Sequence, residues 1–148
     1  MDFDIKIPVR VISGKDCLKN NALMLKTFGK KCLIVTGGKS ALISGALDDM
    51  KYALKECDIK YEIYDKIGPN PRIDHCHEAG TLARDFGADF IVGIGGGSPL
   101  DAAKAVAVYA ANPDLDIFEI YSVTERNKAL PIVLIGTTAG TGSEVGRV

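Results

Sequence analysis

Residues 90–101 of this 148-residue chain read FIVGIGGGSPLD, and this stretch decides the fold class. The run 90–94 is apolar throughout, which is typical of a strand buried on both faces of a sheet. Successive glycines end the run, and an alanine-rich stretch at 100–111 then predicts a helix. A buried strand that passes through a glycine-rich turn into a helix indicates a parallel α/β sheet.

The same alternation of strand and helix extends in both directions along the chain. Further strands are predicted at 32–36, 60–64 and 131–135, with a short one at 8–12. Further helices are predicted at 17–28, 41–56 and 74–86, with a short one near 117–121. We therefore expect one domain over 1–148 with a Rossmann-like, doubly wound α/β fold, in which a mainly parallel sheet carries helices on both faces.

Composition excludes several classes of partner. The formal net charge of -1 provides no basic surface, so we expect no nucleic-acid partner. No apolar run approaches the roughly 20 residues that a membrane span needs, and the first residues lack the bases of a signal peptide. The four cysteines show no CxxC spacing, which fits a reducing compartment. We expect a soluble, cytoplasmic protein without a membrane partner.

The glycine turn is the first candidate site. Gly95, Gly96 and Gly97 lie where backbone N–H groups can approach a ligand without interference from a Cβ atom. The helix that follows adds unpaired N–H groups and the positive end of its dipole. The pattern is neither GxGxxG nor a P-loop, but its shape predicts a diphosphate site.

The residues after the glycines can begin the helix, and one of them, Asp101, has two interpretations. Ser98 can cap the helix, with Pro99 at the favoured first helical position. Asp101 lies three residues after Ser98, so it either completes a variant of the capping box or orients a cofactor or substrate at the cleft edge.

The loop 136–145, which reads GTTAGTGSEV, is the second candidate site. It follows a predicted strand and offers the hydroxyl groups of Thr137, Thr138, Thr141 and Ser143. Hydroxyl groups and backbone amides can surround a ribose or a nicotinamide, and loops at the carboxyl ends of strands are the usual ligand positions in α/β sheets. The alternative is a polar loop that only caps the next helix.

The third candidate site follows an earlier strand, where residues 36–40 read TGGKS. An acidic residue at such a strand end holds the ribose 2′-hydroxyl of NAD in dinucleotide-binding folds. No acid is present, and Gly37, Gly38, Lys39 and Ser40 can instead admit a 2′-phosphate. The sequence therefore favours NADP(H) over NAD(H). The alternative is an ordinary turn in which Ser40 caps a helix.

These loops together resemble one family. The segment 95–104, GGGSPLDAAK, resembles the GGGSPxDxAK segment of the iron-containing (group III) alcohol dehydrogenases. The segment 137–145 resembles their TTAGTGSEV loop, and 69–71 matches their PNP turn. The order and spacing also agree, so the chain resembles the N-terminal, cofactor-binding part of this family. Glycerol dehydrogenase and dehydroquinate synthase share the triple glycine but differ after it, and a relative of either kind is the alternative.

The resemblance implies roles for individual residues. Gly96, Gly97 and Ser98 would bind the diphosphate, Asp101 would lie beside the nicotinamide, and Asn70 would line the cleft. The predicted cofactor contacts are Gly37, Gly38, Ser40, Asn70, Gly95, Gly96, Gly97, Ser98, Asp101, Thr137, Thr138 and Thr141.

The resemblance also implies a helical domain after this region, in which one Asp and three His bind divalent iron or sometimes zinc. The 148 residues contain no such domain, so we predict no catalytic residue, no metal ligand and no activity of the isolated chain. His75 and His77 flank Cys76 near a helix start, where they would point apart, and we interpret them as exposed polar residues. Gly136 replaces a usual Pro, and Gly146 replaces a usual Thr.

Three functions remain open at this point. The chain is the cofactor-binding part of an oxidoreductase acting on small alcohols or aldehydes, or a nucleotide-binding module without a catalytic role. The third possibility is a truncated product whose partly apolar surface drives self-association. Pairing of the strand predicted at 8–12 would produce a homodimer.

Overall fold

A parallel sheet forms the centre of the computed structural model, which describes residues 9–121 and 129–146. Within these residues the strands are β1 (Lys31–Thr36), β2 (Lys60–Tyr64), β3 (Phe90–Gly95) and β4 (Ile132–Gly136). Their order is β2-β1-β3-β4, and every neighbouring pair is parallel. The Rossmann-like α/β fold and these strands are confirmed, each to within one residue of its predicted ends.

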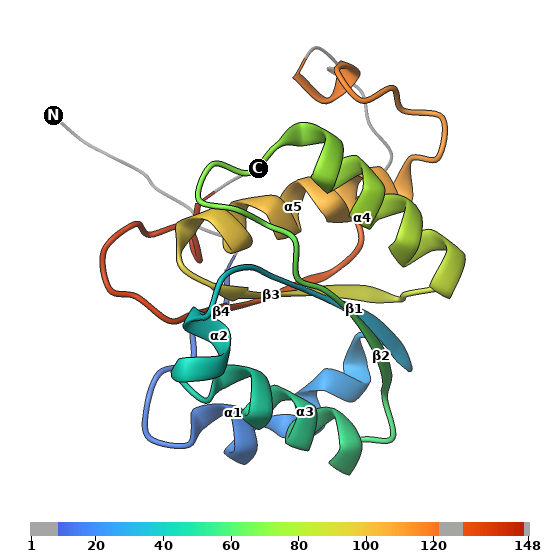
Figure 1. The fold of residues 1–148 in the computed structure, drawn as a ribbon. Coiled ribbons are helices and arrows are strands. Elements are labelled where there is room, and N and C mark those ends of the chain that lie inside the picture. Colours follow the sequence, from blue (N-terminus) through green and yellow to red (C-terminus); the bar gives the residue numbers. More distant parts are fainter. Residues whose placement is uncertain (1–8, 122–128, 147–148) are drawn as a thin grey trace, which may run out of the picture.

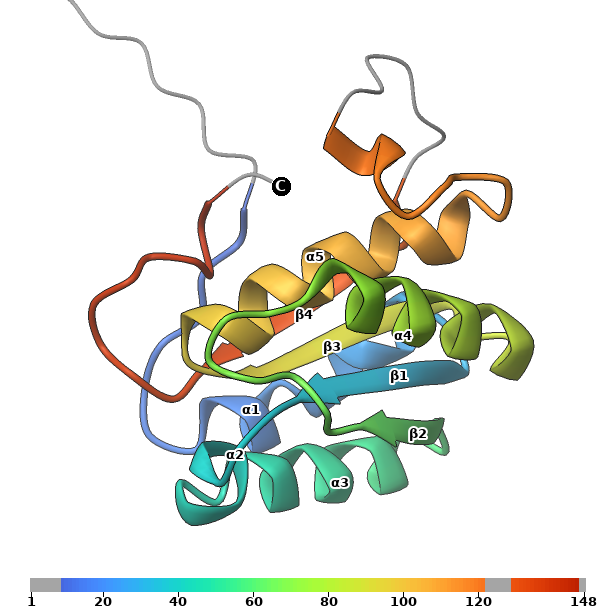
Figure 2. The ribbon, with the colours of Figure 1, turned by 45° about the horizontal axis from the view of Figure 1, so that its top comes forward.

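Helices cover both faces of the sheet (Figures 1 and 2). The helices α4 (Ile73–Phe86) and α5 (Gly97–Ala111) lie on one face. On the other face lie α1 (Cys17–Asn20), the 3-10 helix η1 (Ala22–Thr27) and α3 (Ala46–Glu56). The alternation of side chains along β1 divides the core, because Leu33 and Val35 pack toward α4 and α5 while Cys32 and Ile34 pack toward α3.

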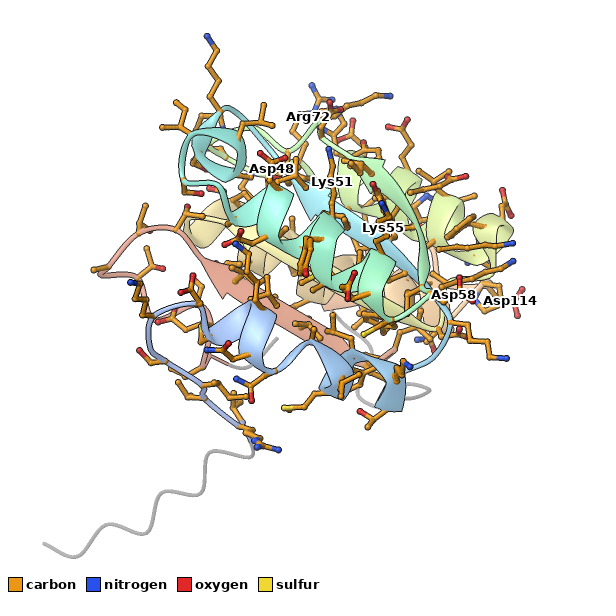
Figure 3. The ribbon with its side chains drawn as sticks, turned by 90° about the horizontal axis from the view of Figure 1, so that it is seen from below. Asp48, Lys51, Lys55, Asp58, Arg72 and Asp114 are labelled. Carbon is orange, nitrogen blue, oxygen red and sulfur yellow. The ribbon has the colours of Figure 1, made fainter. Side chains whose placement is uncertain are left out.

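The helix α3 shows why one of its faces meets the sheet. Leu47, Met50 and Leu54 recur at helical spacing and are buried. Figure 3 shows Asp48 and Lys55 on the outer side of the same helix, where both are exposed. The sheet face is therefore covered by an amphipathic helix.

Two predicted helices are interrupted. The helix predicted at 41–56 is α2 (Ser40–Ile43) followed by α3, because Gly45 takes a left-handed conformation with φ +78° between them. The helix predicted at 17–28 breaks at Asn21, whose side-chain amide donates to Cys17 O at 2.7 Å and draws the chain into η1. The short predicted helix near 117–121 is the 3-10 helix η2 (Glu119–Tyr121).

The strand predicted at 8–12 is wrong for residues 9–12, and Pro8 lies outside the described residues. Residues 9–12 are exposed and form no ladder with a described strand. The alternation of residue types in 8–12 wrongly indicated a strand, since a strand also needs a neighbour for its N–H and C=O groups.

The edge strand β4 is only partly covered. Residues 132–135 are apolar, as in a central strand, but all are half-buried and β3 is the neighbour that they have among the described residues. The partly apolar surface expected from the sequence includes this edge. Self-association through it stays a prediction.

The cysteines supply a test of the fold. Cys32 and Cys76 are buried, and burial raises the pKa of their thiols to about 12 and about 11. Cys57 is also buried, whereas Cys17 is half-exposed. Because thiolate is the reactive form, iodoacetamide at pH 8 should modify Cys17 at least tenfold faster than the other thiols, as peptide mass spectrometry would reveal. Equal rates in native and urea-unfolded protein would contradict this packing.

Candidate functional site

The order of the strands produces a switch point at their carboxyl ends, the place where open α/β sheets have their ligand crevice. From β1 the chain passes to β2 at one edge, and then crosses over to β3 on the opposite side of β1. The loops that leave β1 and β3 therefore run toward opposite faces of the sheet (Figure 2). Such a switch point is where open α/β sheets bind ligands. The two strand ends are joined by a buried hydrogen bond that Thr36 Oγ1 donates to Ile94 O at 2.9 Å.

The glycine turn presents free donors to this crevice. Gly95 has φ +148°, and Pro99 Cγ lies only 2.7 Å from where its Cβ would be, so another residue is excluded. The first helical bond of α5 runs from Leu100 N to Gly96 O, which leaves the first-turn amides of Gly97 and Ser98 without helical partners. These amides can bind an anion.

The predicted cap of this helix is wrong. Gly96, in an extended conformation, is the N-cap of α5, and no side chain caps this helix end. The helix therefore starts earlier than predicted, with Ser98 and Pro99 inside its first turn.

The Ser98 hydroxyl group has a different role. Its Oγ donates to Pro69 O at 2.6 Å, and this hydrogen bond connects the turn after β2 to the start of α5. Asn70, the exposed neighbour of Pro69, is thereby held beside the glycine turn. The predicted residues Asn70 and Ser98 thus meet at one place.

The second candidate loop, residues 136–145, is called the threonine loop; it continues from β4 across the glycine turn. Thr137 N donates to Gly95 O at 2.9 Å. A Cβ at Gly96 would lie 3.5 Å from Thr138 Oγ1, and one at Gly97 would lie 3.1 Å from Thr141 Cγ2. The loop ends in a turn at 143–145. The predicted loop and the glycine turn are therefore in contact.

Thr137 carries an unusual hydroxyl group. Its Oγ1 is buried and has no hydrogen-bond partner among the described residues. Buried hydroxyl groups normally find a partner, because leaving one unpaired costs about 1–3 kcal/mol. This atom is a candidate contact for a ligand in the crevice.

Asp101 does not complete a cap, so the capping-box alternative is wrong. Its side chain is 56% exposed, and its Oδ1 accepts a hydrogen bond from Lys104 Nζ at 3.0 Å. Its Oδ2 accepts one from Ser143 Oγ at 3.3 Å. Lys104 has no role among the sequence-based predictions, although its spacing of three residues from Asp101 was an available signal for an ion pair.

In the loop after β1, close packing requires a glycine at position 37. Gly37 forms an isolated antiparallel bridge with Lys66, and a Cβ at Gly37 would overlap the carbonyl oxygen of Ile67. Gly38 has φ +59° and open space around it. Ser40 is the first residue of α2 rather than its cap, a position that Lys39 takes, so the prediction of a Ser40 cap is wrong.

The charges next to Gly37 are compensated. Lys66 Nζ lies 2.9 Å from Glu78 Oε1, and Tyr64 donates its hydroxyl hydrogen to Glu78 Oε2 at 2.7 Å. The hydrogen bonds from Lys66 and Tyr64 lower the pKa of Glu78. The ammonium group of Lys66 is thus paired with Glu78. Lys39, within the turn itself, is an exposed cation.

Comparison with known proteins identifies the family. The family model described as iron-containing alcohol dehydrogenase matches residues 8–148. The chain belongs to the iron-containing alcohol dehydrogenase family.

Three similar members of this family are alcohol dehydrogenases, and two of them name different cofactors. Long-chain primary alcohol dehydrogenase AdhA of Thermoanaerobacter ethanolicus is 44% identical over 132 residues, which are 88% of this chain and 33% of that protein. NADH-dependent butanol dehydrogenase B of Clostridium acetobutylicum is 36% identical, with 98% of this chain and 37% of that protein covered. NADPH-dependent butanol dehydrogenase of Clostridium saccharobutylicum is 37% identical, with 94% of this chain and 36% of that protein covered.

A solved structure of the family has the same fold. The iron-containing alcohol dehydrogenase of Thermotoga maritima is 42% identical and superimposes with a TM-score of 0.91. The match covers 97% of this chain and 40% of that chain. The chain thus spans about a third of the length of the curated family members it matches.

The two histidines differ from the prediction. His75 and His77 are half-buried rather than exposed, because α4 packs against α5 and the His77 ring meets the Tyr109 ring edge-on at 5.1 Å. Over residues 9–121 and 129–146, no three His, Cys, Asp or Glu side chains form a group that could hold a metal ion. The iron that names the family has no ligand set in this part of the chain.

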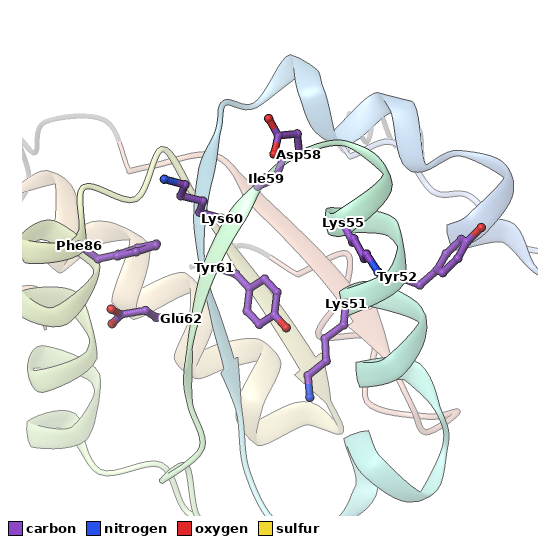
Figure 4. Close-up of a pocket in the computed structure, with 9 residues that line it drawn as sticks. All are labelled: Lys51, Tyr52, Lys55, Asp58, Ile59, Lys60, Tyr61, Glu62 and Phe86. Atoms are coloured by element: carbon purple, nitrogen blue, oxygen red, sulfur yellow. The ribbon is translucent and has the colours of Figure 1, made fainter.

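A separate groove lies far from the three loops, at the amino end of the edge strand β2 (Figure 4). It measures about 690 Å³, and its lining includes Lys51, Lys55, Lys60, Tyr61 and Phe86. The helices α3 and α4 both end here, so their carbonyl groups disfavour an anion. Of these lysines only Lys60 lies on the edge strand β2, where a charged side chain disfavours pairing with other chains, whereas Lys51 and Lys55 belong to α3.

None of the described helices combines the length and the apolar character that spanning a membrane requires.

Proposed function

We propose that residues 1–148 form the dinucleotide-binding domain of an alcohol dehydrogenase that acts on small alcohols and aldehydes. The observation that carries the proposal is the meeting of three loops at the switch point between β1 and β3. When bound there, the nicotinamide supplies the hydride acceptor or donor. The chain supplies binding and orientation.

The crevice suits a diphosphate. The free amides of Gly97 and Ser98, at the positive end of the fifteen-residue helix α5, favour an anion. The unpartnered Thr137 Oγ1 adds a donor at the adjacent strand end. Thr138 and Thr141 would contact the same diphosphate-ribose stretch, and Gly96 leaves space for it.

We further propose that the adenosine end prefers NADP(H). Residues 36–40 contain no acid, Gly38 borders open space, and Lys39 is an exposed cation. These features suit a 2′-phosphate at the Gly37, Gly38 and Ser40 positions. Since family members carry either cofactor in their names, the preference must be decided on this chain.

A titration tests the proposal on the chain itself. NADPH and NADH fluorescence titrations should reveal binding of both, with NADPH at least about tenfold tighter, because its 2′-phosphate gains a charge-assisted contact. Gly97→Val is the matched control, since a side chain there would press on Thr141 and fill the diphosphate position. Binding of neither cofactor would refute the proposed function, and equal affinities would refute only the preference.

The same preparation should have no dehydrogenase activity, because the family's Lewis-acid metal has no ligand set among the described residues. Metal-dependent oxidation of a primary alcohol by the purified chain would contradict this expectation.

Self-association without a catalytic role is the second candidate, favoured by the half-buried apolar edge of β4 and by Val11, which is 65% exposed. Light scattering distinguishes the outcomes. A monomer that binds NADPH supports the binding domain, and a large aggregate that binds neither cofactor supports this second candidate. A defined dimer that binds NADPH would support the predicted homodimer.

A further inference from the structure

Lys104 is a buried cation next to the candidate site. Its side chain is only 5% exposed and lies on the second turn of α5. Burying an ammonium group is costly unless the group is paired and hydrogen-bonded. Its Nζ lies 3.0 Å from Asp101 Oδ1, so the pair offsets this cost.

Asp101 also forms a hydrogen bond with the threonine loop. Its second oxygen, Oδ2, accepts a hydrogen bond from Ser143 Oγ at 3.3 Å. Ser143 belongs to a turn in which Val145 N and Gly146 N both donate to Gly142 O, at 3.0 and 3.1 Å. The three side chains therefore join α5 to the loop, since Asp101 and Ser143 are 42 residues apart in the sequence.

The turn also covers the ammonium group. A Cβ at Gly146 would lie 3.4 Å from Lys104 Nζ, which is ordinary contact distance. On the other side of the turn, Ser143 Oγ lies 3.3 Å from where a Cβ of Gly97 would be. The loop therefore lies between the Lys104 ammonium group and the glycine turn.

We propose that Lys104 is a positioning residue for cofactor binding. Its ammonium group fixes Asp101, and Asp101 holds the 137–146 loop against the glycine turn. The effect on the loop follows from the contacts alone, whereas the effect on the cofactor rests on the proposed function.

Lys104 has a second effect through charge. An unpaired carboxylate at Asp101, four residues from Gly97, would repel a diphosphate bound at the free amides of α5. The ion pair cancels this charge. Loss of Lys104 should therefore weaken cofactor binding both by releasing the loop and by exposing an uncompensated carboxylate.

Hydrogen exchange without cofactor tests the effect on the loop. Ser143→Ala removes the bond to Asp101 without touching the core, and the amides of Val145 and Gly146 should then exchange about tenfold faster. Amides of β3 should keep their wild-type rates. Glu144→Gln, at the exposed neighbouring position, is the matched control and should leave all rates unchanged. Unchanged protection of Val145 and Gly146 in Ser143→Ala would overturn the proposal.

NADPH affinity tests the effect of charge. Lys104→Met should weaken binding by about tenfold or more, and the double variant Asp101→Asn/Lys104→Met should recover much of that loss because the carboxylate is gone. A purely structural lysine would produce no recovery in the double variant, and that result would overturn the proposal. If Lys104→Met fails to fold, Ser143→Ala alone decides through its exchange rates. If the wild-type chain binds no NADPH, the proposed function fails, while hydrogen exchange of Ser143→Ala still decides whether Asp101 holds the loop, and exchange of Lys104→Met decides whether Lys104 contributes to this.

Discussion

A carboxylate introduced at position 38 is expected to reverse the proposed preference for NADPH over NADH. Gly38 has φ +59° and no atom near its Cβ direction, and Asp tolerates this left-handed conformation better than most residues. In Gly38→Asp the carboxylate would accept hydrogen bonds from the ribose hydroxyls of NADH and repel the 2′-phosphate of NADPH. We expect the ratio of NADPH to NADH affinity to fall by about 100-fold, as measured by fluorescence titration.

Two controls make this result specific. Gly38→Asn has nearly the same size and backbone tolerance without the charge, so it should change the ratio by far less. Gly37→Asp should instead lower the urea midpoint, because any Cβ there overlaps Ile67 O and must displace the bridge to Lys66. An unchanged ratio in Gly38→Asp would mean that the adenosine ribose does not bind at the end of β1.

Gly93→Ala, which adds one methyl group at the centre of the sheet, is expected to lower the free energy of unfolding strongly. A Cβ at Gly93 would lie 2.7 Å from Ala103 Cβ and 2.9 Å from Leu134 Cδ2, so α5 must move away from β3. Overpacking of this kind costs about 1–3 kcal/mol. The shift also moves the amino end of α5, so we expect weaker NADPH binding together with a lower urea midpoint.

Gly68→Ala is the matched control for that substitution. Gly68 has no heavy atom within 4 Å of its Cβ direction, so the added methyl should change stability by less than about 0.5 kcal/mol. Equal urea midpoints for the two variants would contradict the close approach of α5 to the sheet.

The layers of the fold were predictable from local sequence, because the determining signals are local. The continuous apolar runs of β1 and β3 reflect helices on both faces, and the glycine that ends α4, Gly87 with φ +75°, stops its helix as expected. The predicted loops also arrive at adjacent strand ends, because parallel neighbours share one edge.

Contacts between distant segments were not predictable in the same way. Ser98 looked like a helix cap, but its hydroxyl group bonds to Pro69 O, 29 residues earlier in the chain. Lys104 had no predicted role, but its side chain is buried and its ammonium group lies next to Gly146 of the turn at 142–146. Apart from the three-residue spacing of Asp101 and Lys104, the sequence has no signal for these contacts, since each depends on how the loops meet after the sheet has formed.

The crevice at the ends of β1, β3 and β4 has a thermodynamic consequence. Its parts lie about 100 residues apart, from Gly37 to Thr141, and they meet only when all three strands are in register. A partly folded chain therefore lacks the crevice, so a dinucleotide that binds there binds only the native state. At 100 times its Kd such a ligand adds about 2.7 kcal/mol to the free energy of unfolding. The cofactor would thus act as a folding ligand for the whole sheet, and the melting temperature would rise with its concentration.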